Sequence, residues 1–260
     1  MDSNLTEWLH LVARWVHVFA GILWVGQTFL FTWMDRQLSL SPQLWMVHSG
    51  GFYLVEKRTV AEPGKLRWFR WEALITFLSG LSLLILVYYA GGLMLDDTVS
   101  SISLAQAVLL GLGLLVAGYL AYDLLWLSPL GKNELVGASL SYALLVALAF
   151  GLLHLLSARA AYLHVGSLMG TIMAVNVWAR ILPAQRVLVA QLAAGKLPDA
   201  KLAARAKLRS KHNTFLVVPL VFLMLSNHFP TATYGNDHAG LILALLVLAG
   251  WGTAKLIREH

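Results

Sequence analysis

Seven apolar runs long enough to cross a lipid bilayer recur along this chain of 260 residues. They lie at about residues 8–33, 71–94, 103–127, 136–157, 160–182, 213–229 and 239–257. A helix of roughly 20 apolar residues matches the thickness of the hydrocarbon layer of a membrane. Charged residues make up only 12% of the chain, against about 25% in a typical soluble domain. The sequence therefore predicts an all-α integral membrane protein, with a single helical-bundle domain of about seven transmembrane helices over residues 1–260.

Lysine and arginine are distributed very unevenly over the connections between these runs. Of the 19 basic residues, 17 fall in residues 34–70, 128–135, 180–211 and 255–260, which share one side of a seven-helix topology. Because basic loops stay in the cytoplasm, we expect a periplasmic N-terminus and a cytoplasmic C-terminus in a bacterial inner membrane. Topology and attraction to anionic lipid then explain the net charge of +6, and no nucleic acid is expected as a partner.

Two cytoplasmic connections are longer than turns. Residues 37–69 are rich in aromatic side chains, and we expect an interfacial or partly re-entrant segment with a tight bend at His48, Ser49, Gly50 and Gly51. Residues 184–211 predict a basic amphipathic helix that is broken near Gly195 and Pro198. Asp199 is suited to cap the second half of that helix, because its carboxylate accepts hydrogen bonds from free backbone amides.

Arg14 and Arg159 are the two basic residues outside the cytoplasmic segments. A charge inside a membrane span is expensive and usually has a partner or a function. Arg14 shares one helix face with His10 and His17, because these residues are spaced three or four apart. Arg159 stands at the outer entrance of the fifth span, where contact with the lipid headgroups is an alternative explanation for its charge.

Six histidines from five spans are predicted to lie in the outer half of the membrane: His10, His17, His154, His164, His228 and His238. Imidazole is a common haem ligand, and Gly21 and Gly166 leave room for a flat macrocycle beside His17 and His164. Arg14 and Arg159 are placed to pair with the two haem propionates. Zinc is less suitable, because no cysteine exists and no carboxylate lies near these histidines.

Depth in the membrane selects among these histidines. At about 1.5 Å per residue, His17 and His164 are the best-matched buried pair, and His228 is next. His48 and His212 lie at the cytoplasmic side, where they either ligate a second haem or are solvated loop residues. The residues thus predict haem b, one copy or two, and each imidazole can also be a hydrogen-bonded structural group.

The chain resembles the bacterial membrane-bound urate oxidase (urate hydroxylase) family. The resemblance is carried in order by residues 14–26, 47–53, 56–57, 65–72, 122–125, 128–130, 159–166, 170–177, 183–186, 209–213 and 226–230. Many of these residues are polar in apolar surroundings. His17, His48, His164, His212 and His228 all fall inside the matching blocks.

The resemblance implies a membrane domain followed in the family by a cytochrome c domain, with oxidation of urate to 5-hydroxyisourate and cytochrome c as electron acceptor. This chain has no cysteine, so we expect the covalent cytochrome to be a separate chain. It also has Leu54 where the family often has a second histidine. The substrate is accordingly expected to be urate or another small molecule.

Three functions remain open at this point. The first is a haem-b redox subunit that passes electrons between a substrate or partner and a periplasmic c-type cytochrome. The second is a urate oxidase in its own right, with substrate-binding candidates Arg14, Glu72, Asp123, Asn176, Arg180 and Asn227. The third is a non-enzymatic anchor or assembly subunit of a respiratory complex, or a transporter; Glu72, Asp123 and Asn176 would then be structural polar contacts between helices.

Overall fold

The computed structural model describes residues 3–58 and 64–259, and helices dominate it. In chain order the elements are α1 (Ser3–Leu40), β1 (Gln43–His48), β2 (Gly51–Glu56), α2 (Trp71–Leu83), η1 (Leu84–Tyr89), α3 (Leu104–Leu127), η2 (Pro129–Lys132), α4 (Glu134–Leu153), α5 (Ala158–Val175), η3 (Asn176–Ile181), α6 (Leu182–Ala193), α7 (Ala200–Leu225), η4 (Ser226–His228) and α8 (Ala239–Glu259). Within the described ranges, six helical stretches are long and apolar enough to cross a membrane. The chain is therefore a multi-pass membrane protein.

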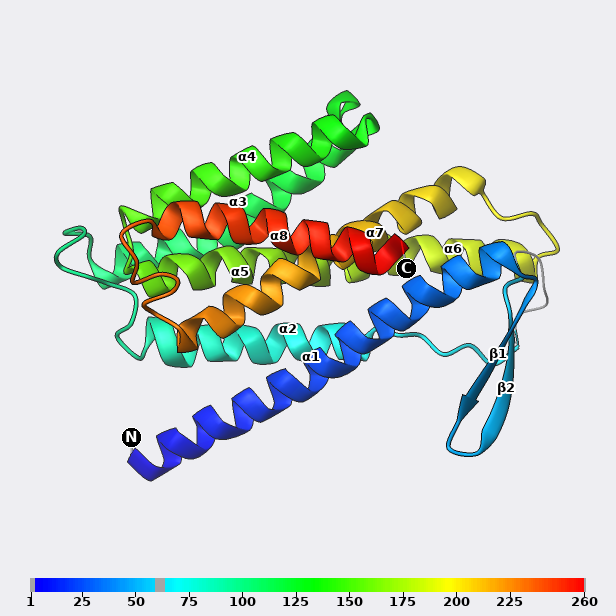
Figure 1. The fold of residues 1–260 in the computed structure, drawn as a ribbon, viewed down its shortest axis with the longest axis horizontal. Helices are drawn as coiled ribbons and strands as arrows, with labels where there is room; N and C mark the ends of the chain where they lie inside the picture. Colours follow the sequence, from blue (N-terminus) through cyan, green and yellow to red (C-terminus); the bar gives the residue numbers. More distant parts are fainter. Residues whose placement is uncertain (1–2, 59–63, 260) are drawn as a thin grey trace.

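Helix α5 forms the centre of the bundle, and α1 lies at its edge (Figure 1). In the most apolar part of the continuous helix over residues 158–193, 61% of the residues are buried, against 11% in α1. Ala160, Ala161 and Tyr162 are at most 1% exposed. Small residues allow neighbouring helices to approach closely in a membrane, where close packing takes over from the hydrophobic effect. The polar side chains of α5 are consequently the ones most shielded from lipid.

The predicted span over residues 213–229 corresponds to the second half of α7 and to η4. Helix α7 is not among the six apolar stretches, since its first half carries five basic residues. Its second half nevertheless packs against α5 and α8. Pro219 lies inside it, and a Cβ added at Gly250 of α8 would come within 2.8 Å of the Pro219 Cδ. The seven-helix topology stays a prediction.

The expectation of an entirely α-helical fold is wrong for Gln43–Glu56. These residues form an antiparallel hairpin in which His48 pairs with Gly51, and the hairpin projects away from the bundle near the end of α1 (Figure 1). The turn residues Ser49 and Gly50 both have positive φ angles, 51° and 77°. Such a two-residue turn matches the twist of paired strands. The tight bend was predicted correctly, but its role as a strand-pairing turn was not.

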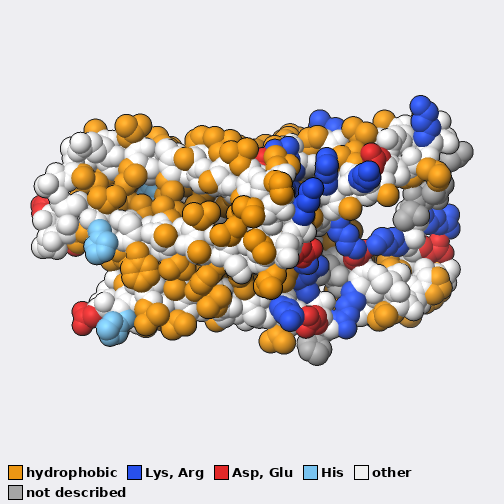
Figure 2. Space-filling view, turned by 90° about the horizontal axis from the view of Figure 1, so that it is seen from above, with side chains coloured by type: hydrophobic (Ala, Val, Ile, Leu, Met, Phe, Trp, Pro, Cys, Tyr) orange, Lys and Arg blue, Asp and Glu red, His pale blue; other side chains and the backbone are white. Residues whose placement is uncertain are grey.

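Basic side chains gather at the end of the molecule that carries the hairpin and α6 (Figure 2). The opposite end carries the start of α1 and the connections over residues 90–103, 154–157 and 229–238; we call it the acidic end, and the first the basic end. Near the basic end, α6 stops before Gly195, whose φ is 68°. The Asp199 carboxylate accepts hydrogen bonds from the amides of Lys201 and Leu202, at 2.8 and 3.1 Å. Both the predicted break and the predicted cap are confirmed.

Two π-helical segments interrupt the long helices. Segment η1 follows α2 and ends at Tyr89, and η3 joins α5 to α6 and holds Asn176 and Arg180. A π turn has one extra residue and so redirects the side chains that follow it, and such turns are frequent at functional sites. Tyr88 and Tyr89 of η1, and Asn176 and Arg180 of η3, all make polar contacts to other helices.

Candidate functional site

The imidazole of His17 is fixed against α2. Its Nδ1 lies 2.9 Å from the carbonyl oxygen of Thr76 and 3.2 Å from the hydroxyl of Ser79. A Cβ added at Gly80 would lie 2.8 Å from the His17 Cε1, so the ring occupies a notch that only glycine provides. Because a carbonyl oxygen can only accept, Nδ1 carries the proton and Nε2 keeps its lone pair. In the described part of the chain, no hydrogen bond to that Nε2 is found.

The imidazole of His164 on α5 is fully buried, with 0% of the residue exposed. Its Nδ1 donates to the carbonyl of Ala160 at 2.8 Å. Its Nε2 is therefore an acceptor, and it accepts a hydrogen bond from the Tyr89 hydroxyl, whose oxygen lies 3.2 Å away. A Cβ added at Gly111 of α3 would lie 2.7 Å from that Nε2. Both nitrogens of His164 are therefore satisfied within a closed contact between three helical segments.

Arg159 lies beside Tyr88 and Asn227 near the acidic end, and the exposed Arg14 acts on the same tyrosine electrostatically. Arg159 Nε donates to the Asn227 Oδ1 at 3.0 Å, and the Tyr88 hydroxyl donates to that same oxygen at 2.9 Å. The Arg159 guanidinium lies 5.9 Å from the centre of the Tyr88 ring, and Arg14 is close enough to interact electrostatically with Tyr88. We call Arg14, Tyr88, Arg159 and Asn227 the arginine cluster. The positive charge of Arg159 in apolar surroundings, with the exposed Arg14 as a more distant charge, can attract an anionic group.

The predicted pair of His17 and His164 is not brought together. The partners of His17 are residues 76–80 of α2, and those of His164 are Tyr88 and Tyr89 of η1. Nine residues of helix separate Gly80 from Tyr89, about 13 Å along the axis. His164 instead adjoins the arginine cluster, because its ring stands 6.4 Å from the ring of Tyr88.

The predicted cofactor glycines lie in contacts between helices. A Cβ added at Gly21 would meet Thr76 of α2 at 3.8 Å, and one at Gly166 would meet the Met224 Cε of α7 at 2.9 Å. His48 and His228 are exposed. His48 lies on the projecting hairpin, where its Nδ1 contacts the Ser49 hydroxyl at 2.9 Å, whereas His212 is in α7.

A second polar network lies near the basic end. Buried Asp123 of α3 binds Arg180, and it also accepts from Arg209 Nη2 at 2.8 Å. Next to it, the Tyr122 hydroxyl lies 2.7 Å from the His212 Nδ1. Amides continue the network: Asn176 Nδ2 donates to Tyr122 at 2.9 Å and to the Asn213 Oδ1 at 3.0 Å, and Asn213 Nδ2 donates to the Met173 carbonyl at 3.0 Å.

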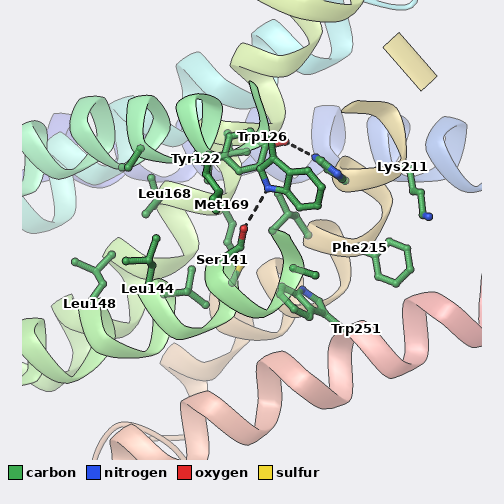
Figure 3. Close-up of a pocket in the computed structure, with 18 of the residues that line it drawn as sticks. Tyr122, Trp126, Ser141, Leu144, Leu148, Leu168, Met169, Lys211, Phe215 and Trp251 are labelled. Carbon is green, nitrogen blue, oxygen red and sulfur yellow. Dashed lines mark hydrogen bonds between the residues drawn. The ribbon is translucent and has the colours of Figure 1, made fainter. Parts of the chain in front are cut away.

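A cavity of about 650 Å³ adjoins this network, between α3, α4, α5, α7 and α8. Its wall is mostly apolar and aromatic, with Trp126, Phe215 and Trp251 around it (Figure 3). His212 also lines it. In the described ranges, no group of three or more His, Cys, Asp or Glu side chains lies close enough together to hold a metal ion.

Some residues of these sites could not be recognised from the sequence pattern. Tyr88, Tyr89, Gly80, Gly111 and Trp251 lie in apolar runs, and nothing in their spacing distinguishes them from lipid-facing positions. A pair of tyrosines at the end of a span was a usable signal, because a buried hydroxyl needs a partner. The contacting glycines had no such signal, since their importance arises only from the opposite helix.

A family model described as urate oxidase N-terminal matches residues 3–259. The chain belongs to this family. No curated protein and no solved structure matches this chain significantly. Family membership confirms the resemblance drawn from the sequence blocks and identifies a membrane domain of the urate oxidase type.

Proposed function

We propose that this domain binds haem b and passes electrons between a substrate or partner and a separate periplasmic c-type cytochrome, in the bacterial inner membrane. Urate is the substrate that family membership favours. The observation that carries the proposal is the state of His17, whose Nδ1 is anchored to the Thr76 carbonyl while its Nε2 is left as a free acceptor. Haem-ligating and other metal-ligating histidines commonly have this arrangement, which fixes the ring orientation and raises its basicity.

The residues present fit such a group. His17 would hold the iron, which supplies one-electron transfer when bound. The arginine cluster would receive the propionates, because Arg159 lies beside Tyr88 near the acidic end and Arg14 acts on the same tyrosine electrostatically. The acidic end is the predicted periplasmic end, which is where a soluble cytochrome c would have to dock.

His164 and His212 are less suited to the role of ligand. The His164 Nε2 already accepts the Tyr89 hydroxyl, so that bond would have to break. The His212 Nδ1 faces the Tyr122 hydroxyl, and Tyr122 itself accepts from Asn176. Among the described residues, the His212 Nδ1 is the one acceptor within hydrogen-bond distance of the Tyr122 hydroxyl. The tyrosine therefore donates to it, and the proton of a neutral imidazole is then on Nε2. A protonated Nε2 has no lone pair to offer a metal.

A reduced-minus-oxidised spectrum and a haem-to-protein ratio of the purified protein test this proposal. We expect a b-type α-band that His17→Ala abolishes and that His238→Ala, at an exposed position of the acidic end, retains. His17→Met offers a thioether, which raises the potential of haem iron; it should keep haem at a higher midpoint potential. A wild-type protein without haem, or full haem loading in His17→Ala, would refute haem binding by His17.

Urate consumption with added oxidised cytochrome c tests the substrate separately. Turnover in the haem-loaded protein is the expected result. Haem loading without turnover would exclude urate as the substrate and would favour an electron-transfer subunit. Stable co-purification with partner proteins and no haem would instead indicate an anchor or assembly subunit.

A further inference from the structure

The cavity near the basic end is not used by the function proposed above. It lies between five helices, and its volume of about 650 Å³ lies within the range of small-molecule sites. Leu135 and Leu144 of α4 line it, and both are also exposed on the bundle surface, at 75% and 57%. The cavity therefore borders the surface that faces lipid, and a ligand can enter it from the membrane.

The hydrogen-bond network determines that His212 offers a hydrogen-bond donor at the cavity. Asn213 donates to a backbone carbonyl, so its Oδ1 must accept from Asn176. Asn176 Nδ2 also donates to Tyr122, and the Tyr122 hydroxyl in turn donates a hydrogen bond to the His212 Nδ1. The neutral His212 ring thus carries its proton on Nε2. This Nε2 is buried and has no hydrogen-bond partner within the described residues.

Trp251 of α8 supplies a second donor of the same kind. It lines the same cavity (Figure 3), and its indole Nε1 is also buried without a partner among the described residues. An indole N–H can only donate. A buried donor without an acceptor is costly, so two of them beside one cavity indicate a ligand that brings acceptor oxygens.

Charge and shape narrow the class of ligand further. The charged residues of the wall, Lys211 and Glu134, pair with each other at 2.5 Å, so the cavity offers no net charge to an anionic lipid or fatty acid. Trp126, Phe215 and Trp251 provide flat aromatic surfaces around it. A neutral planar ring with two carbonyl acceptors and an apolar tail satisfies all these conditions.

We infer that this cavity is a binding site for an isoprenoid quinone, with the His212 Nε2 and the Trp251 Nε1 donating to its carbonyl oxygens. The inference concerns binding alone and is independent of haem binding. Its failure would leave the spectral test of His17 unaffected, and a haem-free protein could still bind a quinone here.

Photolabelling by an azidoquinone, with decylubiquinone as competitor, tests the site in quinone-free nanodiscs. We expect labelled peptides from α3, α4, α5, α7 or α8, which line the cavity, and protection by decylubiquinone. His212→Phe and Trp251→Phe each remove one donor and should raise the protecting concentration about three- to tenfold. Trp178→Phe is the matched control, because Trp178 also has a buried unpartnered indole N–H but does not line this cavity.

Two further variants keep the test decisive. His212→Gln retains a donor and should stay within about threefold of the wild type. Ala138 of α4 lines the cavity, so Ala138→Phe fills it and should abolish protection. Variants are compared only where the thermal transition shows a folded protein, and Trp251→Phe carries the donor test if His212→Phe unfolds. Labelling insensitive to decylubiquinone or to Ala138→Phe would overturn the inference. Equal protection by a phospholipid acyl chain would also overturn it and assign the cavity to lipid.

Discussion

Replacing Asp123 with asparagine should destabilise this fold more than replacing its partner Arg180 with glutamine. The Asp123 side chain is 7% exposed, and its partner Arg209 is 6% exposed at 2.8 Å. Asp123→Asn keeps the volume but leaves the Arg209 guanidinium buried without a counter-charge, which costs about 3–5 kcal/mol. The Arg180 side chain is 39% exposed, so Arg180→Gln should cost about 1 kcal/mol or less after solvent screening.

Thermal unfolding in nanodiscs measures the difference. For a chain of this size, about 2–4 °C per kcal/mol gives a fall in Tm of roughly 6–20 °C for Asp123→Asn and up to about 4 °C for Arg180→Gln. Asp96→Asn, in an exposed loop, controls for a general effect of losing a carboxylate. The double variant Asp123→Leu with Arg209→Met removes both charges and should recover most of the loss. The reasoning fails if Arg180→Gln and Asp123→Asn lower the Tm equally, or if the double variant is worse than Asp123→Asn.

Two further predictions concern local packing and capping. Gly111→Ala should cost about 1–3 kcal/mol, because the added methyl meets His164 at 2.7 Å; Gly113→Ala, with open space beside it on the same helix, should be neutral or slightly stabilising, and equal Tm values would contradict the contact. Asp199→Ala should cost about 0.5–2 kcal/mol by uncapping α7. Asp199→Asn should retain the cap, and faster amide exchange in the first turn of α7 for the alanine variant alone is the readout.

Several features of the site were accessible from the chain itself. Arg14 and Arg159 were predicted to act together because both break the charge pattern; Arg159 lies beside Tyr88 in the structure, and their joint role stays a prediction. The cap at Asp199 was predicted because its signal is local, within three residues. The hairpin at Gln43–Glu56 was missed, because its aromatic residues suggested an interfacial segment and only strand pairing reveals the turn type.

The pairing of the histidines could not be predicted in the same way. Depth along separate helices placed His17 and His164 at similar levels, but depth says nothing about which neighbour each ring faces. His17 faces Gly80 of α2, and His164 faces Tyr89 and Gly111. These neighbours are set by the rotation and packing of whole helices, which a hydropathy pattern leaves open.

The sequence by itself determined the membrane-embedded helical character, the basic and acidic ends and the family, because spanning length, charge asymmetry and ordered motifs are properties of the linear chain. Tertiary structure alone decided which ring nitrogen of each buried imidazole donates a hydrogen bond and where the cavity lies. Tyr89 and His164 are 75 positions apart, and Tyr122 and His212 are 90 apart. Hydrogen bonds at such separations exist only after the helices have packed, and they decide which ring nitrogen accepts and which donates.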